Sequence, residues 1–231
     1  MHPALAALAN PRRTVRRILA TPNALARLKA AGAELPIPVE ETSPRQLDHI
    51  LGRDAVHQGV ALEVAPLDPL PLKKLAGRLV VVLDQVTDPH NVGAIMRSAL
   101  AFGAEAVITT RRHAPAETGV LAKAASGALD QLAVIEVQNL ARALEELRET
   151  GFSLIGLDSG GEATFEAAMT GERVALVLGA EGKGLRRLTR DTCDVVARLD
   201  MPGPLASLNV SNAAVLALYI ASRHLASTSA S

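Results

Sequence analysis

Three polar clusters in the sequence combine residue types that can bind and activate a small polar ligand. The first is TDPHN at 87–91, which precedes an apolar helical pattern carrying Arg97. The second is the glycine-rich run GAEGKG at 179–184, and the third is MPGPLASLNVSN at 201–212. Arginine and carboxylate side chains supply charge, and closely spaced glycines let a ligand approach the backbone. The clusters therefore predict a ligand site with charged groups beside it.

The first cluster leaves two roles open for each of its polar residues. Asn91 stands where it can cap the following helix, which Gly103 is expected to end. Arg97 lies off the apolar face of that helix, so it is either solvated or directed at an anionic group.

The second cluster is not a phosphate-binding P-loop. That motif needs four residues between its first glycine and Gly-Lys, but only two residues separate Gly179 from Gly182-Lys183, and Gly184 follows in place of Ser or Thr. A nucleotide-hydrolysing enzyme is therefore disfavoured. Glu181, in the middle of the run, either orients a hydrogen-bond donor or caps the next helix.

The third cluster has more polar residues than a helix start requires. Pro202 and Pro204 enforce an irregular loop, after which Ser207 or Asn209 opens a long apolar helix. Capping accounts for one of the four polar side chains at 207, 209, 211 and 212. Some of the others are expected to face a ligand.

The elements that position these clusters form a parallel sheet. Apolar runs alternate with helical patterns, as expected for strands covered by helices on both faces, and ligands of such sheets bind at the carboxyl ends of the strands. The strands are predicted at 79–84, 105–110, 131–137, 152–158, 173–179 and 194–200, with helices between most of them. Each polar cluster follows one of these strands. We therefore expect the three clusters to meet at one edge.

The chain is predicted to hold two domains. Residues 1–64 mix short helical patterns with short apolar runs, which indicates a small α/β unit. The proline-rich segment 65–77 is predicted to be a linker, and residues 78–231 form the domain with the parallel sheet.

Composition excludes several classes of protein. Lys and Arg total 24 and balance 24 Asp and Glu, so the chain is not a uniformly basic coat for nucleic acid. The longest apolar run, at 213–221, is too short to cross a membrane, and no signal peptide is predicted. One cysteine, Cys193, and six scattered histidines predict no disulfide and no metal site. A cytoplasmic protein fits best.

Two arginine clusters nevertheless favour contact with a polyanion. The sequence RRLTR at 186–190 is one cluster, and residues 1–30 contain no Asp or Glu. Solvated helix faces are the alternative explanation for both. The side chains expected to bind phosphate groups of such a polyanion are Arg12, Arg13, Arg16 and Arg17.

Taken in order, the three clusters resemble the motifs of the SpoU/TrmH family of RNA ribose 2′-O-methyltransferases. The motifs are NVGAIMRSALAFGAEAVI, LVLGAEGKGL and MPGPLASLNVSNAAV, and the resemblance spans essentially the whole chain. Residues 1–64 are similar to the L30e-like substrate-binding domain of the branch that methylates a guanosine in large-subunit (23S) ribosomal RNA. Two alternatives remain open. The acceptor is transfer RNA, or the protein is a noncatalytic RNA-binding factor in ribosome assembly.

The resemblance implies a Rossmann-like catalytic domain of the SPOUT class with a carboxyl-terminal trefoil knot, a homodimer and S-adenosylmethionine as cofactor. In the family, one residue triplet is usually Ile-Pro-Met, whereas this chain has Leu199-Asp200-Met201. The resemblance implies that the active-site residues are Asn91, Arg97, Glu181, Ser207 and Asn209. It implies that the cofactor is held by Leu178, Gly179, Leu199, Met201 and Leu208.

The implied reaction gives Arg97 a specific task. A ribose hydroxyl must lose its proton during methyl transfer, and an arginine, with a pKa above about 12, is a poor base. We therefore expect the charge of Arg97 to stabilise the developing alkoxide and to hold the adjacent phosphate, while Glu181 and Asn209 orient the groups. His90 is the alternative proton acceptor.

Overall fold

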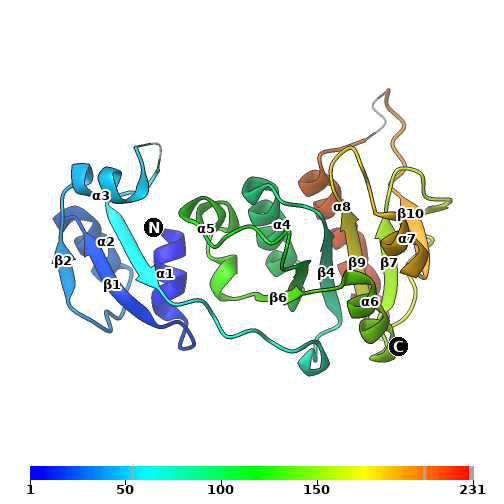
Figure 1. The fold of residues 1–231 in the computed structure, drawn as a ribbon, viewed down its shortest axis with the longest axis horizontal. Helices are drawn as coiled ribbons and strands as arrows, with labels where there is room; N and C mark the ends of the chain where they lie inside the picture. The colour runs from blue at the N-terminus through cyan, green and yellow to red at the C-terminus, as the bar shows by residue number, and fades with distance from the viewer. Residues whose placement is uncertain (54, 205–206, 229–231) are drawn as a thin grey trace.

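The chain folds around two separate β-sheets that lie side by side (Figure 1). The computed structural model describes residues 1–53, 55–204 and 207–228. The amino-terminal sheet has three strands and the second sheet has seven. The chain crosses from one sheet to the other through residues 65–78, which include one 3-10 turn, η1 (Leu72–Lys74).

The amino-terminal sheet is mixed. Its central strand, β1 (Val15–Ala20), runs parallel to β2 (Val39–Glu41) and antiparallel to β3 (Val60–Val64). The helices around it start at well-formed caps: the Thr21 hydroxyl accepts from Ala24 N, and Ser43 forms a capping box with Gln46. These helices are α1 (His2–Ala9), α2 (Pro22–Ala30) and α3 (Pro44–Leu51).

The larger sheet is parallel at every strand pair, as the apolar runs predict. Its order is β6-β5-β4-β9-β7-β10-β8. All six strands predicted from the sequence are present, and β8 is an additional two-residue edge strand. The bounds are β4 (Leu79–Asp84), β5 (Ala106–Thr110), β6 (Ala133–Val137), β7 (Ser153–Leu157), β8 (Ala163–Thr164), β9 (Val174–Gly179) and β10 (Val195–Arg198).

Helices cover both faces of this sheet, which explains why every residue of β4 and β9 is buried. Alternate residues of β4 face opposite cores: Val81 packs with α4 (Pro89–Ala101), α5 (Gly119–Ala125) and α8 (Val210–Thr228). Val82 packs in the other core with α6 (Leu140–Glu149). A short helix, α7 (Arg187–Thr192), lies beside α6, and the turn η2 (Ala128–Asp130) follows α5.

The topology places β9 between β4 and β7, so the loops that follow these three strands are neighbours. The strand order alone does not test the trefoil knot, which stays a prediction. None of the helices in the described part of the chain is both long and apolar enough to cross a lipid bilayer.

Candidate functional site

One cavity lies at the carboxyl edge of the large sheet, where the second and third clusters meet. It is enclosed by the ends of β7, β9 and β10 and by the start of α8. Its lining residues are Leu157, Asp158, Ser159, Leu178, Gly179, Ala180, Glu181, Gly182, Gly184, Leu199, Met201, Ser207, Leu208, Val210 and Ala213. All five residues predicted to hold the cofactor are among them, together with Glu181 and Ser207.

The glycine-rich loop after β9 folds back on itself at the mouth of this cavity. Gly184 N donates to Ala180 O at 2.9 Å, which brings the backbone of Gly184 against Gly179. A Cβ at Gly179 would overlap the Gly184 carbonyl and lie 2.5 Å from Leu185 N. Gly179 is therefore required for space, whereas Gly184, with a φ of +64°, is required for a left-handed turn.

Two carboxylates on either side of β9 hold the end of this loop. Asp84, at the end of β4, is fully buried and accepts from Arg186 N at 2.9 Å and from Arg186 Nε at 2.6 Å. Asp158, just after β7, accepts from Leu185 N at 3.3 Å and from Arg190 at 2.7 Å. The loop is thus fixed to both neighbouring strands, which keeps the cavity open.

Asp158 is ionised in this setting. Burial opposes its charge, but hydrogen bonds from Gly160 N, Arg190 and Leu185 N, with the charge of Arg190, hold the pKa of this carboxyl below its ordinary value. Asp158 and Asp84 were not identified from the sequence as site residues. Each is the last residue of a predicted strand, so a polar residue at the sheet edge was the signal available.

A hydrogen bond joins the second cluster to the third. Asn209 Nδ2 donates to Glu181 Oε2 at 3.4 Å. Asn209 Oδ1 accepts from Ser211 N at 2.9 Å and from Ser211 Oγ at 2.6 Å, so Asn209 also caps the start of α8. The alternative that Glu181 caps the next helix is wrong, because α7 begins at Arg187 with Arg186 as its N-cap residue.

The first cluster lies on α4, next to but outside the cavity lining. Asp88 is the N-cap of α4 and accepts from His90 N at 3.1 Å and from Asn91 N at 3.4 Å. The prediction that Asn91 is the cap is therefore wrong, because the preceding aspartate takes that position. The side-chain amide of Asn91 makes no hydrogen bond to the described residues, and Arg97 is exposed. Neither residue is among the described residues that line the cavity.

The lining suits a cationic ligand without phosphate. It contains the carboxylates Asp158 and Glu181, and no Lys, Arg or His is among its described residues. Although the start of α8 lies at the cavity, the two carboxylates repel a phosphate group, whereas they attract a sulfonium cation. The leucines and Met201 give the cavity apolar walls.

Arginines of the two basic clusters have different surroundings. Arg12 and Arg16 are exposed, and Arg17 is paired with Glu40 at 2.6 Å on the surface. Arg13 is buried, with Nε 2.7 Å from Asp130 Oδ1. The expectation that Arg13 contacts RNA is corrected by this burial, since its guanidinium is enclosed between the two sheets' domains.

The arginines at 186–190 are bound within the chain as well. Arg186 and Arg190 bind the carboxylates of Asp84 and Asp158, and Arg187 lies 3.7 Å from Asp191. These contacts give Arg186 and Arg190 a structural role in holding the loop, whereas the Arg187 side chain is 95% exposed. In the described ranges no group of three or more His, Cys, Asp and Glu residues is placed to hold a metal ion.

Comparison with known proteins decides the family. The sequence matches the SpoU rRNA Methylase family over residues 78–219, and residues 1–70 match the family of RNA 2′-O ribose methyltransferase substrate-binding domains. The chain belongs to the SpoU methylase family. The family match covers the large sheet, the cavity and all three clusters.

Curated relatives and solved structures of this family resemble the chain over most of its length. The 23S rRNA (guanosine-2′-O-)-methyltransferase RlmB of Pseudomonas putida is 42% identical over 207 residues, which is 85% of this chain and 82% of that protein. The enzyme of the same name from Xylella fastidiosa is 44% identical over 81% of this chain and 78% of its own. The structure of the SpoU methyltransferase AviRb from Streptomyces viridochromogenes, in complex with AdoMet, has a TM-score of 0.80 at 26% identity, covering 98% and 88% of the two chains.

Proposed function

We propose that the protein transfers a methyl group from S-adenosylmethionine to the 2′-oxygen of a guanosine ribose in 23S ribosomal RNA. The observation that carries the proposal is the 42% identity to a relative of that name, over a span that includes both domains. A noncatalytic RNA-binding role is disfavoured because the cavity and its polar residues are intact. The single free thiol, Cys193, suits a reducing cytoplasm as the place of action.

The cavity at the ends of β7, β9 and β10 is the proposed cofactor site. The backbone of Gly179 and the side chains of Leu178, Leu199, Met201 and Leu208 would hold the adenosine part. The cofactor supplies a methyl group on a cationic sulfur, for which the nearby carboxylates are a suitable environment. Asp200, which replaces the family's usual proline, is not among the described lining residues and forms an ion pair with Arg198 Nε at 3.0 Å.

Residues of the three clusters divide the work on the ribose. Glu181, bonded to Asn209, is placed at the cavity to orient the acceptor nucleotide. Arg97 would stabilise the negative charge that develops on the 2′-oxygen and hold the neighbouring phosphate, with Asn91 and Ser207 as hydrogen-bond partners of the RNA. Alignment of oxygen with the methyl group supplies much of the rate, since well-held reactants reach effective molarities of about 10⁵–10⁸ M. His90 is exposed at the start of α4 and is the alternative proton acceptor.

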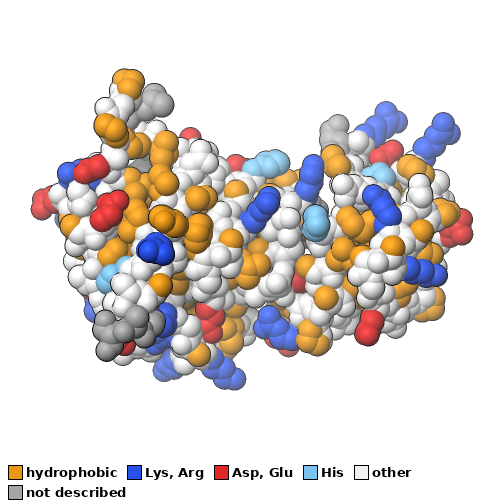
Figure 2. All heavy atoms as spheres, turned by 180° about the vertical axis from the view of Figure 1, so that it is seen from behind, with side chains coloured by type: hydrophobic (Ala, Val, Ile, Leu, Met, Phe, Trp, Pro, Cys, Tyr) orange, Lys and Arg blue, Asp and Glu red, His pale blue; other side chains and the backbone are white. Residues whose placement is uncertain are grey.

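A homodimer would bring Arg97 to a cavity that its own subunit does not complete. Helix α8 packs one face in the core but exposes apolar side chains on the other. The exposed fractions are 38% for Val215, 46% for Leu216 and 52% for Tyr219. Tyr219 contacts the ring of Phe102 at the end of α4, with centroids 6.1 Å apart. Figure 2 shows hydrophobic side chains gathered on the half of the molecule that holds α8. A second copy is the proposed cover for this surface.

The dimer proposal has a direct test in mixed subunits. Arg97→Ala and Glu181→Ala are each expected to abolish or reduce turnover alone. If Arg97 serves the cavity of the partner subunit, a mixture of the two variants contains heterodimers with one complete site and recovers part of the activity. If Arg97 serves its own subunit, the mixture stays as inactive as its components.

The phosphate contacts of the substrate are assigned to the amino-terminal domain. Arg12 and Arg16 are free of ion pairs to described residues, and Arg17 shares its charge with Glu40. Because phosphate contacts release counterions, removing Arg16 should weaken RNA binding and reduce its salt dependence.

The substrate itself is tested with labelled cofactor. Purified protein is incubated with methyl-labelled S-adenosylmethionine and with 23S ribosomal or transfer RNA transcripts. Label in the ribosomal transcript alone supports the proposal. Label in transfer RNA alone would show that transfer RNA is the substrate, with the same methyl-transfer chemistry. Cofactor binding without label in either RNA would point to a different acceptor.

A further inference from the structure

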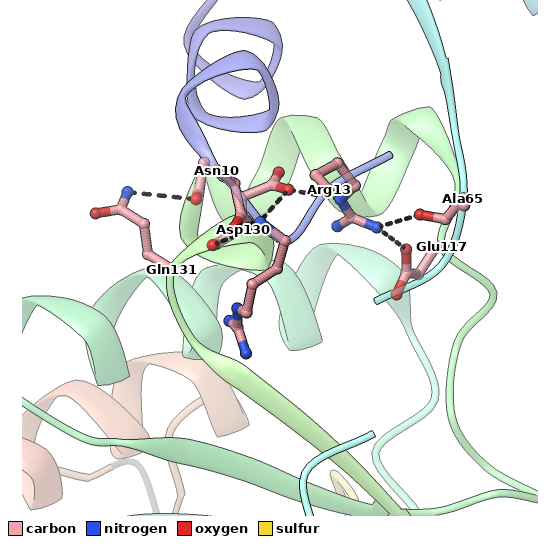
Figure 3. Close-up of polar contacts among 8 residues, drawn as sticks. Asn10, Arg13, Ala65, Glu117, Asp130 and Gln131 are labelled. Atoms are coloured by element: carbon pink, nitrogen blue, oxygen red, sulfur yellow. Dashed lines mark hydrogen bonds and ion pairs between the residues drawn. The ribbon is translucent and has the colours of Figure 1, made fainter. Parts of the chain in front are cut away.

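A buried ion pair joins the amino-terminal domain to the catalytic domain. The side chains of Arg13 and Asp130 are 3% and 7% exposed, and they meet at 2.7 Å. Arg13 Nη1 donates further to Ala65 O at 2.9 Å and to Glu117 Oε2 at 3.3 Å (Figure 3). From the amino-terminal domain, the guanidinium of Arg13 thus contacts both the crossing segment and the catalytic domain.

The backbone around the ion pair packs closely where the two domains meet. Asn10 Nδ2, at the end of α1, donates to the Asp130 carbonyl at 2.8 Å, and Arg13 N donates to Asn10 O at 3.0 Å. Gly127, just before η2, has a φ of +93°, and a Cβ there would lie 3.0 Å from the Cβ of Ala6. Helix α1 therefore rests directly on the α5–η2 segment. This is a packed interface with its polar groups bonded.

The same segment is packed tightly on α4, the helix of the first cluster. A Cβ at Gly93 would lie 2.8 Å from Ala125 N, so α4 and α5 approach each other almost at backbone contact. Gly93 lies between Asn91 and Arg97 in the sequence. A continuous path of packed elements therefore leads from α1 through η2 and α5 to the residues proposed to act on the ribose.

We propose that Arg13 and Asp130 are positioning residues that fix the amino-terminal domain in one orientation relative to α4. This inference rests on the proposed function: RNA held by the first domain is presented to Arg97 in one register. A buried ion pair contributes little net stability because desolvation offsets its attraction, but it tolerates only one geometry well. Such a pair can therefore fix the orientation of the amino-terminal domain. Without the pair, only the packing of α1 on η2 and the proline-rich crossing segment would hold the two domains, so their relative orientation would be less closely fixed.

The orientation is measured by distances between spin labels in the two domains. Labels are attached through Glu34→Cys in the first domain and Glu145→Cys in the second, both exposed positions, with Cys193→Ser as background. Labelled chains are mixed with an excess of unlabelled Cys193→Ser chains, so that distances within one subunit are measured even in a homodimer. We expect a narrow distance distribution for the otherwise unchanged protein and a broad one for Arg13→Gln. A broad distance distribution in the protein that retains Arg13 would overturn the proposal. This result does not depend on which RNA the enzyme methylates.

The consequence for the reaction is measured separately. Arg13→Gln should lower kcat/KM for the RNA by about 10- to 100-fold, as expected when a reactant is misplaced by about 1 Å. Binding of S-adenosylmethionine should be unchanged, because the cavity lies on other elements. The control is Arg148→Gln, which removes an arginine–carboxylate pair with Asp194 inside the catalytic domain, where the two side chains are 44% and 41% exposed. This variant should keep the same kcat/KM. A merely structural role of Arg13 would lower the Tm of Arg13→Gln without changing its kcat/KM.

A milder variant keeps the test valid if Arg13→Gln fails to fold. Asp130→Asn retains the volume of the side chain and one acceptor oxygen for Arg13. It should broaden the label distances and reduce kcat/KM in the same direction. Unchanged distances and unchanged kcat/KM in a folded variant would refute the positioning role. If methylation is absent from every RNA tried, the proposed function fails while the distance measurement still decides whether the domains are fixed.

Discussion

Replacing Gly179 by alanine should distort the proposed cofactor cavity without unfolding the domain. The added Cβ would overlap the carbonyl carbon and oxygen of Gly184 and come within 2.5 Å of Leu185 N. These atoms are backbone, so no side chain can rotate away, and the loop at 180–185 must move. That loop forms one wall of the cavity.

The size of the effect follows from the overlap. Overpacking typically costs about 1–3 kcal/mol, and each 1.4 kcal/mol that falls on the bound state alone is tenfold in Kd. Because Asp84 and Asp158 hold the far end of the loop, the displacement is concentrated at the cavity. We therefore expect Gly179→Ala to weaken S-adenosylmethionine binding by about 10- to 100-fold.

Gly103→Ala provides the control. Gly103 ends α4 with a φ of +77°, and nothing lies within 4 Å of an added Cβ. The alanine therefore costs only about 1 kcal/mol of left-handed backbone strain and should lower Tm by a few degrees without affecting the cofactor. Calorimetric titration with S-adenosylmethionine and thermal unfolding of both variants separate the two effects. A folded Gly179→Ala protein that binds the cofactor as tightly as the unchanged protein would refute the assignment of the cavity.

Three further predictions concern charged and reactive groups. Arg97→Ala should leave cofactor binding intact and abolish turnover, so methyl transfer by this variant would remove Arg97 from the mechanism. Asp84→Asn places an amide N–H opposite Arg186 Nε and should destabilise the domain by about 2–3 kcal/mol, measured by urea unfolding; an unchanged midpoint would contradict the role of the pair. Burial raises the pKa of Cys193 to about 12, so at pH 8 a thiol reagent should label it only after unfolding, and rapid labelling of the native protein would be inconsistent with this burial.

The parallel sheet was predictable because its strands are buried on both faces. Continuous runs such as LVVVLD and VALVLG match β4 and β9, and each has helices on both sides. The edge strand β8 has two residues, which is too short for a pattern, and α5 is a short Gly- and Ala-rich segment. The hydrophobic periodicity of both segments is too weak to predict them from the sequence.

The meeting of the second and third clusters was also predictable, because parallel strands end at one edge of a sheet. The hydrogen bond between Glu181 and Asn209 joins residues 28 positions apart. Individual roles were harder to assign. Asn91 and Asp88 are both good capping residues, and only the helix start distinguishes them.

The burial of Arg13 could not be predicted from the sequence. It stands beside the exposed Arg12 in a stretch without acidic residues, so all arginines there look alike. Its partner Asp130 is 117 positions away, and only the packing of α1 on η2 brings the two together. Long-range pairing of this kind leaves no local pattern.

The chemical identity of the methylated product tests the central claim most directly. A 23S ribosomal RNA transcript is incubated with the protein and S-adenosylmethionine carrying a deuterated methyl group, then digested to nucleosides and examined by mass spectrometry. The account predicts the deuterated methyl in 2′-O-methylguanosine, and none after Glu181 and Arg97 are both replaced by alanine. A deuterated methyl on a base, with the ribose unlabelled, would contradict it.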